Sequence, residues 1–309
     1  MRTFRILLAA LALIIAAPAN AADMRDETVE VPARQGSKAI RLTATIYAPR
    51  GNGPFPLVVI NHGKSAGNPS RQADSRFYPE ALQFVKRGYA VVVPIRAGFG
   101  TSGGTYVSTC EKPLAALGRI WADDVRAVID YARTLPYVDA QRIVVIGASQ
   151  GGLVAAALGA SDVPGLVGIV NFSGGLRQDR CKGWPDRNIA AFRAYGAKTR
   201  VPALFLYGDN DLHWGNGELS HRFFDAYHAG NPRSTYVDTG TFEKGSSHYL
   251  FESFDGLQVW VPLVGEFFRS LGLNWDETRD LRHPGPGVAL EDVDAVPFQN
   301  RYNTIRRGY

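Results

Sequence analysis

A serine, an aspartate and a histidine follow one another along this chain in the settings that nucleophilic catalysis requires. Ser149 stands in Gly147-Ala-Ser-Gln-Gly151, which fits the pattern G-x-S-x-G. The run 142–146 before it, apolar apart from its arginine, predicts a buried strand, and the small residues 153–158 after it predict a helix. Such a turn from strand to helix holds a serine hydroxyl exposed above a helix N-terminus. We therefore predict that Ser149 is a nucleophile.

A serine hydroxyl is a poor nucleophile until a base accepts its proton, and that base needs an acid to orient it. After an elbow of this kind, the acid and then the base follow the serine along the chain. His248 comes after a predicted strand and before the last predicted helix, and we predict that it is the base. Asp211 is the predicted acid because it closes Gly208-Asp-Asn-Asp after a predicted strand, and Asp209 in the same turn is the alternative.

The remaining histidines after the serine fit the position of the base less well. His221 and His228 fall in a predicted helix at 219–229, where we expect them on the surface, and His283 lies in a hinge rich in Pro and Gly. His213 follows the predicted acid directly, at a position that suits an acid rather than a base.

A tetrahedral intermediate needs two preorganised N–H donors. We predict that these are the backbone N–H groups of Gln150, directly after the nucleophile, and of Lys64, in the loop after an apolar predicted strand. Gly63 and Ser65 are the neighbouring options for the second donor. His62 precedes the serine, so we interpret it as an organiser of this loop rather than as a base.

Strands and helices alternate along the chain without repeats, which predicts an α/β fold with a mostly parallel central sheet and helices on both faces. The alternating patterns at 28–31 and 41–48 predict antiparallel edge strands at its beginning. The polar clusters described above follow predicted strands, at the edge where ligand chemistry collects in such sheets. Helices are expected at 77–87, 119–135, 153–158, 189–197, 219–229 and 259–271.

Two further polar segments suggest cofactor chemistry at first sight. The Gly-rich segment 96–104 lacks the G-K-[ST] of a phosphate-binding loop, so we interpret it as a tight turn that frames the pocket. Asp123 and Asp124 are adjacent in a predicted helix, where their side chains point apart, so a packing role is preferred to a metal site. We therefore predict neither a metal nor a cofactor.

The beginning of the chain has the pattern of a secretory signal peptide. Arg2 and Arg5 precede the apolar run 6–17 and the small-x-small site that ends at Ala21, so we predict a signal peptide over 1–21 and a periplasmic or secreted protein. The apolar run is short for a membrane span, and no later stretch is long enough. Cleavage would reduce the formal charge from +5 to +3, and no Lys/Arg run exceeds two residues, so nucleic acid binding is disfavoured.

Export also bears on Cys110 and Cys181, the two cysteines of the chain. Both lie in polar, Gly-rich segments, and two loop cysteines in an oxidising compartment are expected to form a disulfide. Two unrelated thiols are the alternative. Neither cysteine lies on an elbow, so neither is a predicted nucleophile.

With these residues in place, the chain from about residue 28 to 272 resembles the α/β-hydrolase superfamily, and is most similar to its exported dienelactone-hydrolase-like and prolyl-oligopeptidase-like members. The resemblance rests on the following motifs: His62-Gly63, Arg96-x-Gly98-x-Gly100-x-Ser102, Gly147-Ala-Ser149-Gln-Gly151, Gly208-x-x-Asp211 and His248. It implies the α/β-hydrolase fold, which we place at 22–275, followed by a tail at 276–309. It also implies a serine hydrolase that cleaves a small-molecule carboxylic ester through an acyl-enzyme, with Ser149, His248 and Asp211 as its triad.

The same motifs leave two other functions open. A peptidase or amidase would use the same triad, although peptidase members usually carry a large propeller or lid domain, for which this chain has no room before the core. A non-catalytic binding protein on a hydrolase scaffold is disfavoured by the complete triad. True dienelactone hydrolases use Cys as the nucleophile, so the serine argues against dienelactone itself as the substrate.

Overall fold

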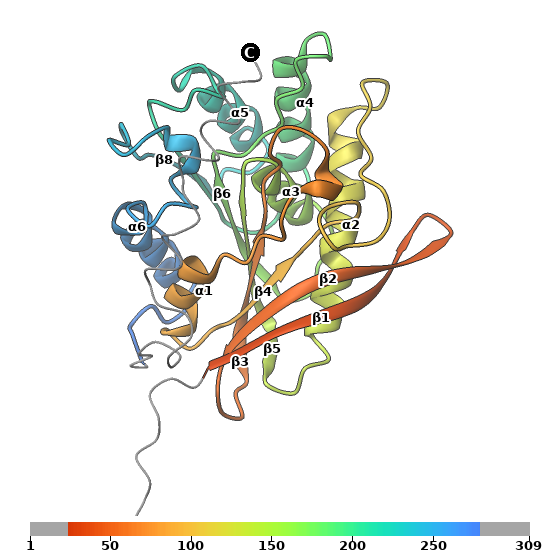
Figure 1. Ribbon diagram of the computed structural model, residues 1–309. Coiled ribbons are helices and arrows are strands. Elements are labelled where there is room, and N and C mark those ends of the chain that lie inside the picture. Colours follow the sequence, from red (N-terminus) through yellow and green to blue (C-terminus); the bar gives the residue numbers. More distant parts are fainter. Residues whose placement is uncertain (1–23, 279–309) are drawn as a thin grey trace, which may run out of the picture.

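The computed structural model describes residues 24–278, which form a single eight-stranded sheet with helices on both faces (Figure 1). The strands are β1 (Met24–Gln35), β2 (Lys38–Pro49), β3 (Phe55–Asn61), β4 (Ala90–Pro94), β5 (Val138–Ala148), β6 (Leu166–Phe172), β7 (Ala203–Tyr207) and β8 (Ser234–Asp238). The helices are α1 (Tyr78–Val85), α2 (Leu114–Ala132), α3 (Gln150–Gly159), α4 (Trp184–Gly196), α5 (Glu218–His228) and α6 (Leu257–Ser270). Two short 3-10 helices, η1 (Pro69–Arg71) and η2 (Ser247–Tyr249), lie in loops.

The strand order in the sheet is β1-β2-β4-β3-β5-β6-β7-β8. β1 and β2 form an antiparallel hairpin, β2 pairs antiparallel with β4, and every pairing from β4 to β8 is parallel. This confirms the predicted α/β fold, in which antiparallel strands open a mostly parallel sheet. Because the parallel strands run in one direction, the loops after β3, β5, β7 and β8 all leave the sheet at its carboxyl edge.

The sheet is covered by one apolar core on each face. Side chains alternate between the faces along each strand, so Val59 of β3 packs against α2 and α3 whereas Val58 and Ile60 pack on the opposite side. Helices α2, α3, α4 and α5 bury their apolar faces in the first core, and α1 and α6 bury theirs in the second. All ten residues of α3 are buried, so the helix that carries the predicted elbow is held from every side.

Two helices, α2 and α4, begin five residues earlier than the sequence pattern predicts. α2 begins at Leu114 rather than at 119, because its added first turn is apolar on the side facing the core. α4 begins at Trp184 rather than at 189, with Pro185 in its first turn. A proline is tolerated there because its missing N–H would have had no partner within the helix.

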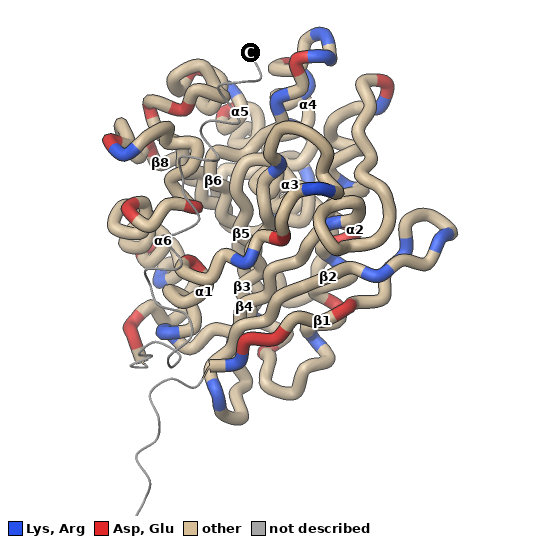
Figure 2. The backbone as a smooth tube through the Cα atoms, viewed as in Figure 1, with Lys and Arg blue, Asp and Glu red and all other residues tan. Residues whose placement is uncertain are grey.

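The predicted signal peptide, 1–21, lies outside the described residues, as does the predicted tail apart from residues 276–278. Within the described range, no helix has the length and apolar character that a membrane span needs. Figure 2 shows Lys and Arg residues interspersed with Asp and Glu along this part of the chain.

Cys110 and Cys181 form a disulfide, as the sequence predicts, with their Cα atoms 5.4 Å apart. The bond joins the loop before α2 to the loop between β6 and α4. Arg187 of α4 strengthens the same junction, because its guanidinium donates to the carbonyls of Cys110 and Lys112 at 2.8 and 2.7 Å. Two loops at the carboxyl edge of the sheet are thereby tied to each other and to α4.

We expect the double variant Cys110→Ser/Cys181→Ser to be less stable by about 4 kcal/mol, because the bond closes a long loop and restricts the unfolded chain. Equilibrium denaturation of the two proteins in guanidinium chloride measures the difference. Wild type treated with a reductant should unfold at the same denaturant concentration as the untreated double variant. Equal stability of the oxidised wild type and the variant would contradict this prediction.

Candidate active site

Ser149 sits at the junction of β5 and α3 in a conformation that residues with a side chain rarely adopt. Its φ is 53° and its ψ is −121°. The close packing of this turn explains the glycines on either side of it. A Cβ on Gly147 would stand 2.0 Å from the carbonyl oxygen of Gly151, and a Cβ on Gly151 would stand 2.2 Å from that of Asn61. Ser149 itself is half-buried, so solvent reaches the turn.

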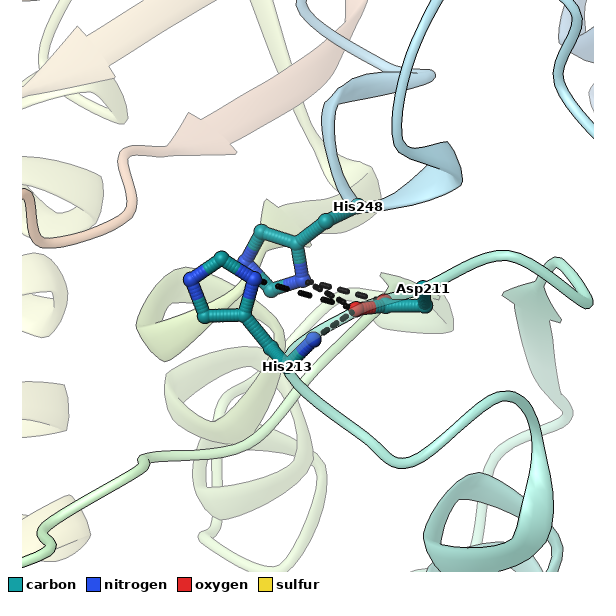
Figure 3. A group of neighbouring side chains, drawn as sticks. All are labelled: Asp211, His213 and His248. Carbon is teal, nitrogen blue, oxygen red and sulfur yellow. Dashed lines mark hydrogen bonds and ion pairs between the residues drawn. The ribbon is translucent and has the colours of Figure 1, made fainter. Parts of the chain in front are cut away.

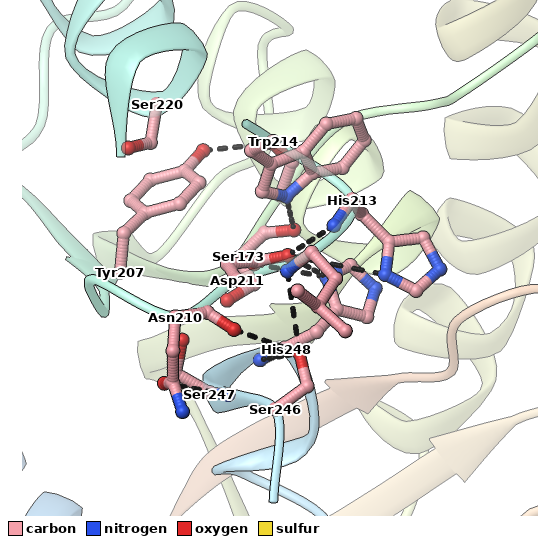
Figure 4. A network of polar contacts seen from close by, with 12 residues as sticks. Ser173, Tyr207, Asn210, Asp211, His213, Trp214, Ser220, Ser246, Ser247 and His248 are labelled. Carbon is pink, nitrogen blue, oxygen red and sulfur yellow. Dashed lines mark hydrogen bonds and ion pairs between the residues drawn. The ribbon is translucent and has the colours of Figure 1, made fainter. Parts of the chain in front are cut away.

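Backbone hydrogen bonds connect this turn to the neighbouring strand end. The N–H of Ser149 donates to the carbonyl of Phe172 at 2.9 Å, and its carbonyl accepts from the N–H of Gly175 at 3.1 Å. The indole N–H of Trp214, three residues beyond the predicted acid, donates to the carbonyl of Ser173 at 2.9 Å. These bonds connect the ends of β5, β6 and β7, and Figure 4 shows the one between Trp214 and Ser173.

The structure brings the predicted acid and the predicted base together. The two carboxylate oxygens of Asp211 lie 3.1 and 3.0 Å from Nδ1 of His248. Asp211 is fully buried and His248 is 6% exposed. A carboxylate can only accept, so Nδ1 carries the hydrogen and the lone pair of Nε2 remains available. Asp209, the alternative acid, is exposed and has no such contact with a histidine of residues 24–278.

Asn210, to which the sequence analysis gave no role, holds the histidine loop against the acid loop. Its amide nitrogen donates to the carbonyls of Phe242 and Gly245, at 3.1 and 2.8 Å. Its amide oxygen accepts from the N–H groups of Phe242 and Ser247, at 3.0 and 3.2 Å. The sequence offers one signal for this role, which is that Asn210 lies between the two candidate acids. An Asn side chain there can both donate to and accept from a neighbouring backbone.

His213 lies closer to the predicted base than the sequence suggested. Its ring stacks on that of His248 with centroids 3.8 Å apart and planes 20° from parallel. Its backbone N–H donates to Oδ1 of Asp211 at 2.9 Å. Burial, and then the neighbouring imidazole, lower the pKa of His213 to about 4. His221 and His228 are exposed on α5, as predicted.

The loop after β3 runs directly beside the elbow. A Cβ on Gly63 would stand 3.3 Å from Cβ of Ser149, so only glycine leaves full room for the two backbone segments that meet here. Nδ1 of His62 donates to the carbonyl of Gly63 at 2.7 Å, while Nε2 accepts from the backbone N–H of Arg96 at 3.1 Å. These two bonds define the neutral tautomer of His62. Burial, assisted by the Arg96 charge, lowers its pKa well below the usual value, so His62 organises the loop.

The Gly-rich segment forms a tight turn, as predicted, and its first residue, Arg96, has a further role. Its guanidinium is fully buried and donates to three oxygens: the carbonyl of His62 at 2.7 Å, the carbonyl of Gly63 at 3.3 Å and the side-chain amide of Gln150 at 2.9 Å. Gln150 in turn donates to the hydroxyl of Tyr106 at 2.8 Å. Arg96 therefore joins the loop after β3 to the first residue of α3.

The charge of Arg96 is buried without a close counter-ion in the described part of the chain. Burial lowers its pKa to about 10. The carboxylate of Asp124 lies nearby, where it accepts from the N–H of Ala97 at 3.1 Å, and burial raises its pKa to about 6. Asp123, its neighbour in α2, is exposed, so the two carboxylates point apart as the sequence predicts.

Among the hydrogen bonds of the described residues, none is donated by the backbone N–H of Gln150, of Lys64 or of Gly63. Gln150 is the first residue of α3, where an N–H has no partner within the helix. The N–H of Ser65 donates to the side chain of Gln72 at 3.3 Å, which disfavours it as a donor to a ligand. Gln150 and Lys64 therefore stay the predicted donors, with Gly63 as the remaining alternative for the second.

The arrangement thus combines a half-buried serine on a strained turn, an imidazole that a carboxylate orients, and the predicted N–H donors. Such a set is suited to attack on a carbonyl carbon, with the N–H groups receiving the charge that develops on its oxygen. No metal ion or organic cofactor is needed for that chemistry.

Comparison with known proteins identifies several relatives. The family model of X-Pro dipeptidyl-peptidases (S15 family) matches residues 36–180, a range that contains the elbow and the loop after β3 but ends before Asp211. The quorum-quenching protein AidA of Acinetobacter baumannii is 32% identical over 127 residues, which are 41% of this chain and 38% of that protein. The match therefore spans well under two thirds of this relative's length.

Solved structures are similar over most of the described chain. An esterase from Pyrococcus furiosus matches with a TM-score of 0.57 and 19% identity, covering 88% of this chain and all of that one. An acylaminoacyl peptidase from Pyrococcus horikoshii matches with a TM-score of 0.59 and 16% identity, covering 87% of this chain and 44% of that one. At these identities the similarity establishes a shared fold.

Proposed function

We propose that this chain is an exported serine hydrolase of the α/β-hydrolase type, which cleaves a carboxylic ester through an acyl-enzyme. The observation that carries the proposal is the buried pair of Asp211 and His248, at 3.0 Å, on the same sheet edge as the strained Ser149. A buried, hydrogen-bonded carboxylate beside an imidazole is what a general base in such a triad requires.

In the proposed reaction, the hydroxyl of Ser149 attacks the ester carbonyl while Nε2 of His248 accepts its proton. Asp211 keeps the hydrogen of His248 on Nδ1 and stabilises the imidazolium that forms. The proton then passes to the departing alcohol, which leaves an acyl group on the serine. Water, deprotonated by the same imidazole, releases the acid and restores the hydroxyl.

The contacts of Arg96 support the assignment of the second oxyanion donor. The carbonyl of Gly63 and the N–H of Lys64 belong to one peptide group, and they point in opposite directions because that group is planar and trans. Arg96 and His62 both donate to this carbonyl, at 3.3 and 2.7 Å, and so fix the direction of the N–H. Arg96 also holds Gln150, which carries the first donor. We therefore propose that Arg96 is a positioning residue for both donors.

Two observations support export. The first is the signal-peptide pattern of residues 1–21. The second is the disulfide between Cys110 and Cys181, because disulfides persist in oxidising compartments. We propose a periplasmic or secreted location for the mature protein.

A peptidase or amidase with the same triad is the second candidate, favoured by the match to the X-Pro dipeptidyl-peptidase model. A panel of p-nitrophenyl esters and aminoacyl p-nitroanilides separates the two, because both release the same chromophore. We expect kcat/KM to be higher for the esters. Higher values for the anilides would make the amidase function the correct one.

We expect a fluorophosphonate probe to label the wild type but not Ser149→Ala, because the probe reacts with an activated serine. Ester hydrolysis by the variant should fall by a factor of about 10⁴ to 10⁶ in kcat. Ser161→Ala, beyond the end of α3, is the matched control and should label like the wild type. Labelling of Ser149→Ala, or its absence in wild type, would refute the assignment.

We expect Arg96→Lys to lower kcat about 100-fold with little change in KM, because a compact ammonium lacks the planar fork by which the guanidinium reaches three separate oxygens, so the N–H donors lose their alignment. Steady-state kinetics on a p-nitrophenyl ester measures both constants. Arg222→Lys, on the exposed side of α5, is the control. A similar rise in KM with unchanged kcat would indicate a role in substrate binding. Unchanged values of both constants would exclude the positioning role.

A further inference from the structure

The imidazole of His213 lies face to face with that of His248, the proposed base. The ring centroids are 3.8 Å apart and the planes are 20° from parallel. Figure 3 shows the two rings side by side, next to the carboxylate of Asp211. The backbone N–H of His213 donates to that carboxylate at 2.9 Å, so His213 contacts both members of the proposed pair. The proposed function gives His213 no task.

Hydrogen bonding through Nδ1 does not account for the position of the His213 ring. This nitrogen is buried and has no hydrogen-bond partner among the described residues. It lies 3.9 Å from Oδ1 of Asp211, which is too far for a hydrogen bond. The ring of His213 therefore interacts with the pair through its face, by stacking on His248.

The hydrogen bond to Asp211 fixes only one end of the His248 ring. Such a bond keeps most of its strength over a departure of about 30° from linearity. Because Nε2 is one ring carbon away from Nδ1, a tilt of about 30° at Nδ1 moves Nε2 by about 1 Å. A misplacement of about 1 Å can cost about 100-fold in rate. A base that must direct Nε2 at Ser149 therefore needs contacts on the ring itself.

Three aromatic side chains provide such contacts, and His213 differs from the other two. The ring planes of Trp214 and Tyr249 meet that of His248 at 61° and 84°, with centroids 5.7 and 5.4 Å away. Among the ring contacts of residues 24–278, His213 alone lies nearly parallel to His248 and covers one of its faces. Rings 3.8 Å apart are already in van der Waals contact, so His248 cannot tilt toward that face.

The ring of His213 also contributes to the cover over the pair. The side chains of Asp211 and His248 are 1% and 4% exposed, whereas that of His213 is 35% exposed. His213 is thus the member of the group that reaches solvent. Loss of its ring would open one face of His248 to water, and a hydrogen bond weakens where the local dielectric rises.

A ring stacked on the base must stay uncharged, because His248 becomes a cation when it accepts the proton of the serine. Burial, and then the neighbouring imidazole of His248, lower the pKa of His213 to about 4. Above about pH 5 His213 is therefore neutral, and a cation over the face of a neutral aromatic ring is stabilised. The ionisable groups around His213 are those of Asp211, His248, Tyr249, Arg177 and Asp179.

We propose that His213 is a positioning residue, whose neutral ring holds the imidazole of His248 in the plane that directs Nε2 at Ser149. The same face then lies against the imidazolium during the reaction. This inference rests on the proposed function. It assigns His213 to the orientation of the base and gives it no contact with the substrate.

The test compares two substitutions of His213 with a matched control. His213→Ala removes the ring, whereas His213→Phe restores a flat ring without a titratable nitrogen, and the partial exposure of the position leaves room for it. His221→Ala is the control, because His221 is exposed on α5 and stacks on Tyr236 with centroids 4.4 Å apart. Denaturation in guanidinium chloride shows whether each variant is folded, and His213→Tyr supplies the flat ring if His213→Phe is not.

We expect His213→Ala to lower kcat for a p-nitrophenyl ester by about 10- to 100-fold with little change in KM. His213→Phe should recover most of this loss, and His221→Ala should behave like wild type. The acid limb of kcat/KM should be the same for His213→Phe and wild type, because residue 213 does not change its charge above about pH 5. An unchanged kcat in His213→Ala, a His213→Phe variant as slow as His213→Ala, or a shifted acid limb would overturn the inference.

Proton NMR measures the orientation of the base without turnover. The hydrogen on Nδ1 of His248 is bonded to a buried carboxylate and therefore resonates far downfield, and His248→Gln identifies this signal by removing it. We expect a sharp signal in wild type and in His213→Phe, and a signal broadened by exchange with water in His213→Ala. Signals of equal width in all three proteins would contradict the role of the stack.

Failure of this inference is distinct from failure of the proposed function. A protein that hydrolyses esters at Ser149 with the same kcat and the same NMR signal in His213→Ala would keep the function and lose the positioning role. A protein that a fluorophosphonate does not label would lose the function, and with it the effect of His213 on catalysis, whatever the NMR signal shows.

Discussion

The chain passes from β5 into α3 through one residue, Ser149, whose φ of 53° no β-branched or bulky residue adopts without strain. A turn this tight brings the first residues of the helix against the strand that precedes it and against β3. The glycines at 147 and 151 give the backbone the space for this, since a Cβ on either would stand within 2.2 Å of a carbonyl oxygen. Strain of this kind persists only where the surroundings enforce it. Here the enforcing elements are α3, with all its residues buried, and the strands on both sides of β5.

A second constraint is the fully buried guanidinium of Arg96. Removing a cation from water is costly unless its hydrogen-bonding groups are satisfied, and here neutral oxygens of three residues satisfy most of them. Because those oxygens belong to the loop after β3 and to Gln150, the requirement to solvate the charge also determines how these two segments lie against each other. His62 adds to the same arrangement as a neutral imidazole that bridges Gly63 and Arg96. The planar, forked shape of the guanidinium is what allows one side chain to reach all of these acceptors.

On the other side of the elbow, one carboxylate organises two histidines. Asp211 accepts from Nδ1 of His248 and from the backbone N–H of His213, and the two imidazole rings stack. Asn210 holds the histidine loop in place, so the pair does not depend on the Asp211 contact alone. Burial and a convergent carboxylate are the features that suit His248 to general-base chemistry.

The sequence by itself determined the order of strands and helices, the elbow at Ser149 and the identity of the disulfide, because each has a local pattern. Alternation between strands and helices predicts a parallel sheet, and G-x-S-x-G between a strand and a helix predicts a turn that needs small neighbours. It also placed Asp211 and His248 after strands, but motif spacing left Asp209 as an alternative to Asp211. Only the tertiary structure distinguished them, because burial and contact with His248 depend on which loop side chain turns inward. The hydrogen-bond partners of Arg96 and Asn210, and the ring partner of His213, follow from no local pattern. Their partners lie up to 54 residues away along the chain, and contacts of that kind exist only once the sheet has brought its loops to one edge.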